Sequence, residues 1–152
     1  MASTAMSTSN HTLNINEEIH IKAPLDITFA ALLEQIGPES THPDGTPMPM
    51  KVETWPGGRW YRDLGEGKGH LWGHVQAIKA PGLLEMYGPL FMSYPVMNNV
   101  QYRLTEVDGG TLIKFQHSAF GFIPDQYREG VTKGWAYIHA QVRARAEAKR
   151  SK

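Results

Sequence analysis

Two adjacent stretches decide the fold: residues 99–120, NVQYRLTEVDGGTLIKFQHSAF, and residues 125–149, DQYREGVTKGWAYIHAQVRARAEAK. The first contains two alternating segments, Asn99–Val107 and Thr111–Phe120, joined by Asp-Gly-Gly, and predicts a β-hairpin. The second has apolar residues at helical spacing and predicts one long helix, about 37 Å in length at 1.5 Å per residue. A sheet with one apolar face would be buried against that helix.

The preceding part of the chain predicts more strands and one short helix. Alternation followed by a helical stripe indicates a strand at Ile15–Ile21 and a helix at Leu25–Ile36. Further strands are expected at residues 51–55, 59–63, 70–79 and 83–87. Two connections are unusual: residues 37–50 are rich in proline, and residues 88–97 are apolar but broken by two prolines. The expected architecture is α+β, a curved antiparallel sheet of about six or seven strands wrapped around a long C-terminal helix.

Composition narrows the classes of function. The chain has 152 residues, with 15 basic and 15 acidic side chains and no cysteine. Balanced charge argues against a nucleic acid or a membrane surface as partner, and the absence of cysteine fits a reducing compartment. We expect a disordered polar tail at residues 1–13, a single domain at residues 14–150, no membrane span and a cytoplasmic location.

Several short motifs occur in an order that resembles a known superfamily. They are Ala23-Pro24 with Phe29 and Ala31-Leu32, then Pro56-Gly57-Gly58-Arg59, Gly73-His74-Val75, Gly110-Thr111 with Phe115 and His117, and Gly134-Trp135. Their succession resembles the helix-grip fold of the START-like, or SRPBCC, superfamily, and most of all the branch named after the activator of heat-shock protein 90 ATPase. The proline-rich loop departs from the pattern, because such proteins often have a short helix with a tryptophan there.

The resemblance implies a cavity between sheet and helix that holds a small apolar or aromatic molecule. Strand parity places Tyr102, Phe115 and His117 on the face toward the helix. The predicted pocket residues are Trp60, Leu71, Val75, Met86, Phe91, Tyr94, Met97, Tyr102, Phe115, His117, Trp135 and Ile138. Met48-Pro49-Met50, in the proline-rich loop, is expected to contact the apolar connection at residues 88–97 at the opening of this pocket.

The candidate for acid–base chemistry is His117, since an interior histidine can act near neutral pH. The alternative is a core histidine whose ring is satisfied by a hydroxyl such as that of Tyr102. His139, one turn after Trp135, is expected to be solvated.

His70 and His74 are four residues apart on a strand, roughly 13 Å, which is too far to share a metal ion. We expect no metal and no cofactor.

Three functions are compatible with these observations. The first is non-enzymatic binding of a small apolar molecule, with a homodimer as a possible assembly. The second is a cyclase- or hydrolase-like enzyme that uses His117. The third, implied by the name of the branch, is a module that regulates a chaperone ATPase. The sequence contains no catalytic motif, and it favours the binder.

Overall fold

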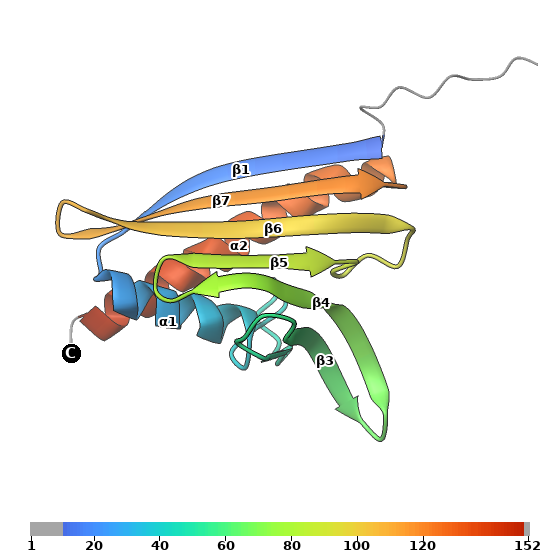
Figure 1. The fold of residues 1–152 in the computed structure, drawn as a ribbon, viewed down its shortest axis with the longest axis horizontal. Helices are drawn as coiled ribbons and strands as arrows, with labels where there is room; N and C mark the ends of the chain where they lie inside the picture. Colours follow the sequence, from blue (N-terminus) through green and yellow to red (C-terminus); the bar gives the residue numbers. More distant parts are fainter. Residues whose placement is uncertain (1–10, 151–152) are drawn as a thin grey trace, which may run out of the picture.

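The computed structural model describes residues 11–150, which form a seven-stranded antiparallel sheet and two helices. In chain order the elements are β1 (Thr12–Ile21), α1 (Leu25–Ile36), β2 (Lys51–Val52), β3 (Arg59–Gly65), β4 (Lys68–Lys79), β5 (Leu83–Gly88), β6 (Val96–Val107), β7 (Gly110–Gly121) and α2 (Asp125–Arg150). The strand order is β1-β7-β6-β5-β4-β3-β2, and α2 runs along one face of the sheet (Figure 1). This arrangement confirms the predicted helix-grip architecture.

Most strand boundaries differ from the prediction by one to three residues, and the differences at β1 and β2 are described first. β1 begins at Thr12, so Leu13, which is buried, belongs to the sheet and not to the expected tail; the rest of that tail prediction, residues 1–10, lies outside the described residues. β2 consists of Lys51–Val52 alone, because residues 53–58 form a turn in which the Gly58 amide donates to the carbonyl of Trp55.

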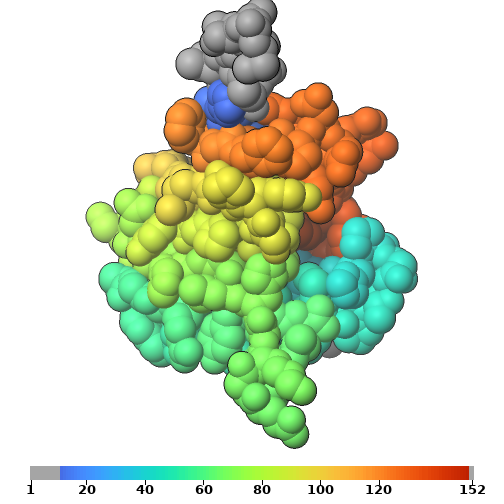
Figure 2. Space-filling view, turned by 90° about the vertical axis from the view of Figure 1, so that its right-hand side faces the viewer, coloured from blue at the N-terminus to red at the C-terminus, as the bar shows by residue number. Residues whose placement is uncertain are grey.

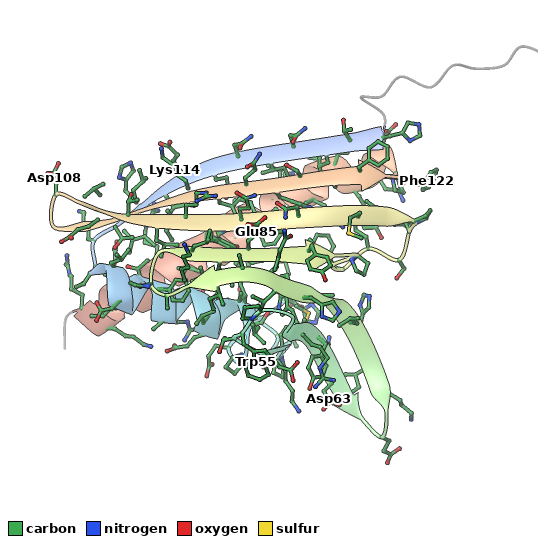
Figure 3. All side chains as sticks on the ribbon, viewed as in Figure 1. Trp55, Asp63, Glu85, Asp108, Lys114 and Phe122 are labelled. Atoms are coloured by element: carbon green, nitrogen blue, oxygen red, sulfur yellow. The ribbon has the colours of Figure 1, made fainter. Side chains whose placement is uncertain are left out.

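The β6–β7 hairpin has the predicted register and parity. Tyr102 pairs with Phe115, and Val100 pairs with His117. All four of these side chains are buried on the face toward α2. The opposite face of the sheet is polar around Glu85, which lies there (Figure 3) and accepts hydrogen bonds from the side-chain amides of its cross-strand neighbours on β6. Period-2 alternation therefore predicted correctly which side chains of β6 and β7 face α2.

A β-bulge changes the parity of β4. Trp60 of β3 pairs with Gly73, but the next β3 residue, Tyr61, pairs with Leu71, so that Trp72 is the extra residue of the bulge. A bulge bends its strand and shifts the following side chains to the other face. Leu71, which parity along an unbroken strand placed inward with Val75, is instead 44% exposed, while Trp72 packs against the buried ring of Trp60 with centroids 5.1 Å apart.

Contacts between the two helices and the sheet close one end of the core. Arg145 of α2 donates to Oε1 of Gln35 in α1 over 3.1 Å. The hydroxyl of Thr111, in β7, donates to the carbonyl of Ala23 over 2.8 Å, which holds the start of α1 on the sheet. Neither described helix is long and apolar enough to cross a membrane.

Candidate functional site

A cavity of about 630 Å³ lies between the N-terminal half of α2 and the proline-rich loop. We call it the α2 cavity. Its wall on α2 is formed by Gln126, Tyr127, Gly130, Val131, Gly134, Trp135, Tyr137 and Ile138. The loop contributes Thr41, His42, Pro43 and Met48, and the sheet side contributes Trp72 and Phe91. In Figure 2 the cyan segment that includes this loop lies beside the orange-to-red C-terminal part of the chain.

The α2 wall is one face of the helix. Gly130, Gly134 and Ile138 recur every four residues, and Val131 and Trp135 fall beside them, so all project toward the same side. Val131 and Trp135 are nearly fully buried, at 5% and 2% exposure. The C-terminal half of α2 does not line this cavity, and there Arg145 bonds to Gln35 of α1.

The proline-rich loop is folded into a small hairpin. Thr41 and Pro47 form an isolated antiparallel bridge, and the amide of His42 donates to the carbonyl of Thr46 over 2.8 Å. The carboxylate of Asp44 accepts the Thr46 amide over 2.9 Å inside the turn. The hydroxyls of Thr41 and Tyr137 hydrogen-bond at 2.9 Å, so this hairpin is attached to α2 across the cavity. Residues 37–50 therefore supply a defined wall of the cavity.

Aromatic rings form the wall on the sheet side. The Trp72 and Phe91 centroids are 5.6 Å apart, and those of Phe91 and Trp135 are 6.3 Å apart, both in edge-to-face arrangements. Trp72 reaches the cavity because of the bulge, and Phe91 comes from the β5–β6 connection. Among the described lining residues there is no carboxylate, lysine or arginine, and His42 is the one histidine. Such a lining suits an uncharged apolar molecule.

His117 lies beneath the cavity wall with both ring nitrogens hydrogen-bonded. The indole N–H of Trp135 donates to Nδ1 over 2.9 Å, and Nε2–H donates to Oδ1 of Asn98 over 2.7 Å. The Asn98 amide in turn donates to the carbonyls of Gly88 and Pro89, each over 3.1 Å. Burial lowers the pKa of His117 to about 4, so the ring is neutral at neutral pH. This ring has no free nitrogen for acid–base chemistry and does not line the cavity.

A second buried chain of hydrogen bonds runs beside the first. The Tyr102 hydroxyl donates to Nε2 of His139 over 3.0 Å, and the opposite nitrogen, Nδ1, bonds to the carboxylate of Glu17. Burial, together with the charge of Glu17, raises the pKa of Tyr102 well above its ordinary value. The expected solvation of His139 is therefore wrong: its ring is 3% exposed, because β1 and β6 satisfy both nitrogens. The alternative that Tyr102 satisfies the His117 ring is not formed either, since the Tyr102 hydroxyl bonds to His139 and His117 bonds to Asn98 and Trp135.

The structure divides the predicted pocket residues into four groups. Phe91, Trp135 and Ile138 line the α2 cavity. A second group forms the packed core, without lining the cavity: Trp60, Val75, Met86, Tyr102, Phe115 and His117. Tyr94 is half-buried against Tyr127, with ring centroids 5.4 Å apart.

The remaining two predicted residues, Leu71 and Met97, point outward and are 44% and 56% exposed. The bulge at Trp72 moves Leu71 to the outer face. Met97 was expected in a loop, but β6 begins at Val96, and within that strand Met97 shares the outward parity of Asn99. Both placements correct the prediction.

Several lining residues were missing from the prediction. Trp72 was missed because a bulge leaves no trace in simple alternation. Gly130 and Gly134 carried a signal, since two glycines inside a helix are costly, although the sequence does not say what approaches them. Thr41, His42 and Pro43 were missed because only the unusual length and composition of their loop marked it as functional.

The described histidines and acidic residues form no group of three that could hold a metal ion. His70 accepts a hydrogen bond from the Trp72 indole over 3.2 Å, while the His74 ring lies 3.1 Å from the carbonyl oxygen of Gly57. The two histidines thus have separate local partners.

Comparison with known proteins shows the fold. No protein-family model matches the chain, and no curated protein is similar to it in sequence. Among solved structures, the Aha1 dimer from Colwellia psychrerythraea is 19% identical with a TM-score of 0.63, and the match covers 89% of this chain and 96% of that one. Ara h 8.0201 is 16% identical with a TM-score of 0.62, over 90% of this chain and 99% of that one.

A third neighbour is the di-domain ARO/CYC StfQ from the steffimycin biosynthetic pathway, 10% identical with a TM-score of 0.65. That match covers 95% of this chain and 54% of StfQ, so this chain spans about half of that protein. At these identities the likeness concerns the fold alone. The chain has the same helix-grip fold as these proteins.

Proposed function

We propose that this chain binds a small, uncharged, apolar or aromatic molecule in the α2 cavity. The observation that carries the proposal is a cavity of about 630 Å³ whose described lining is aromatic and aliphatic, with a few hydrogen-bonding groups and no carboxylate or ammonium. Binding sites for small molecules have this size and this composition.

Affinity would come from burial against Trp72, Phe91 and Trp135, and orientation from a few polar groups. The Thr41–Tyr137 hydroxyl pair and the side chain of Gln126 are available at the cavity wall. This assignment replaces Tyr102, Phe115 and His117 as the expected contacts, since those side chains are already packed or hydrogen-bonded to one another and to the core. The enzymatic alternative through His117 has no support in this geometry.

An uncharged, fluorescent apolar probe, N-phenyl-1-naphthylamine, tests the proposal. We expect saturable binding to the folded chain, energy transfer from tryptophan to the probe, and a higher melting temperature with increasing probe concentration, because a ligand that binds only the native state stabilises it. Trp72→Phe should reduce the energy transfer, while Trp55→Phe, at an exposed site outside the cavity, should leave it nearly unchanged.

Phe91→Ala provides a second test, with Phe122→Ala as the matched control, because Phe122 is 53% exposed and does not line the cavity. The first substitution should weaken probe binding and the second should not. Absence of saturable binding, or equal effects of the two substitutions, would contradict the proposal.

Association with a second copy of the chain stays a prediction. The neighbour from Colwellia psychrerythraea is described as a dimer. Here Met97 and Phe120 form an exposed apolar pair on the outer face of β6 and β7, at 56% and 66% exposure. Sedimentation of the unmodified chain and of Phe120→Ser tests whether this face is buried between two copies.

A further inference from the structure

Two glycines in the wall of the α2 cavity have no explanation within the protein itself. Gly130 and Gly134 lie inside a 26-residue helix, where glycine is less favourable than alanine by roughly 1 kcal/mol per position. Helix glycines usually occur where the backbone needs a positive φ or where another segment packs closely. Neither position has a positive φ.

No described segment approaches these glycines either. A Cβ atom built at Gly130 or at Gly134 would meet nothing within 4 Å. At Gly73, in β4, the opposite holds: a Cβ atom there would come within 2.2 Å of the carbonyl oxygen of Tyr87. The strand glycine is therefore required by packing, whereas the two helix glycines face open space in the cavity.

The two glycines together create a bare strip of helix backbone. Four residues of helix rise about 6 Å, and both positions fall on the same face. The strip is flanked by the buried side chains of Val131 and Trp135. Without Cβ atoms the surface along this strip, beside those two side chains, is formed by peptide groups. A flat ring can lie against such a surface more closely than a ligand of globular shape.

We propose that Gly130 and Gly134 are the specificity-determining residues of the cavity and form the seat of a planar, uncharged fused-ring ligand. The faces of the rings rest on the bare backbone of α2, and their edges meet Trp72 and Phe91 on the sheet side. A hydroxyl or carbonyl group on the rim of the ligand hydrogen-bonds to the Thr41–Tyr137 pair. This inference rests on the proposed binding function and adds the shape of the ligand.

The test compares two probes that differ in shape. Naphthol is planar and adamantanol is a compact cage, and they have the same number of carbon atoms and one hydroxyl each. Calorimetric titrations are carried out on the unmodified chain, on Gly130→Ala, on Gly134→Ala and on Thr132→Ala. Thr132 is the matched control, because it is exposed on α2 between the glycines and does not line the cavity.

We expect the unmodified chain to prefer naphthol. Either glycine substitution should weaken naphthol binding roughly tenfold, the size of effect that one methyl group has in a fitted pocket, and should affect adamantanol less. The melting temperature of each glycine-to-alanine variant should rise by about 2–4 °C, because alanine is the better helix former. Thr132→Ala should leave both affinities unchanged. A loss of binding in a more stable protein separates a ligand seat from a folding defect.

Two results would overturn the inference. If the alanine variants bind naphthol as tightly as the unmodified chain, or lose affinity for both alcohols by the same factor, the glycines do not select a flat ligand, and the cavity proposal stands. If the unmodified chain binds neither these alcohols nor N-phenyl-1-naphthylamine, the binding function itself fails, and the inference fails with it.

Discussion

The two ends of the space between the sheet and α2 are built differently. At the packed end, between the sheet and the middle of α2, the interior is filled by Tyr102, Phe115, His117 and His139. Every described buried side-chain nitrogen or oxygen has a hydrogen-bond partner. Toward the N-terminus of α2, two glycines and a short hairpin leave about 630 Å³ empty. The packed end supplies stability and the open end offers room for a ligand, so changes at each should have separable effects.

Removal of a ring from the packed end should have the largest effect. Phe115 is 2% exposed and contacts Tyr102 and Trp135 at ring-centroid distances of 4.9 Å and 4.8 Å. We expect Phe115→Ala to lower the free energy of unfolding by about 3–5 kcal/mol, as measured by urea denaturation. Phe91→Ala, at the half-buried cavity wall, should cost less than half as much; equal costs would remove the distinction between the two ends.

Acid should destabilise the packed end through His117. Its pKa is lowered by burial from an ordinary value of 6.5 to about 4, so the unfolded chain takes up a proton at higher pH than the folded chain does. The stability that this group contributes is complete above pH 6.5 and is lost as the pH falls to about 4, a total of about 3 kcal/mol.

Urea denaturation from pH 7.5 to pH 4 measures this slope. His117→Gln should flatten the curve, whereas His74→Gln, on the outer part of β4, should follow the unmodified chain. An unchanged slope in His117→Gln would mean that other groups dominate the acid response.

Detachment of the hairpin at the open end should have the smallest effect. Thr41→Val removes the hydrogen bond to Tyr137, a contact worth roughly 1 kcal/mol. We expect the amides of His42 and Met48, which are bonded within the loop, to exchange with solvent about fivefold faster. Global stability should change little. Tyr137→Phe should have the same effect, and a global loss of stability in either variant would show that the open end is part of the core.

Much of the fold could be predicted because its patterns are local. Alternation around the Asp-Gly-Gly turn predicted the β6–β7 hairpin, and helical spacing predicted α1 and α2 with their starts at Leu25 and Asp125. The candidate site was harder to predict, because a cavity is defined by space between elements. Parity indicated that Phe115 and His117 face inward, but not that their neighbours would fill the interior around them. Leu71 was misplaced because a bulge depends on pairing with β3.

The amino-acid sequence by itself determined the order of the elements, the inward faces of β6 and β7 and the apolar stripe of α2, since each follows from side-chain periodicity along one element. Only the tertiary structure decided which inward side chains are packed and which border empty space. It joined Trp135 to His117 and Asn98, placed the loop at residues 41–48 opposite Tyr137, and left Gly130 and Gly134 uncovered. The physical reason is that a void depends on the distances between segments far apart in the chain, and no periodicity along the chain records those distances.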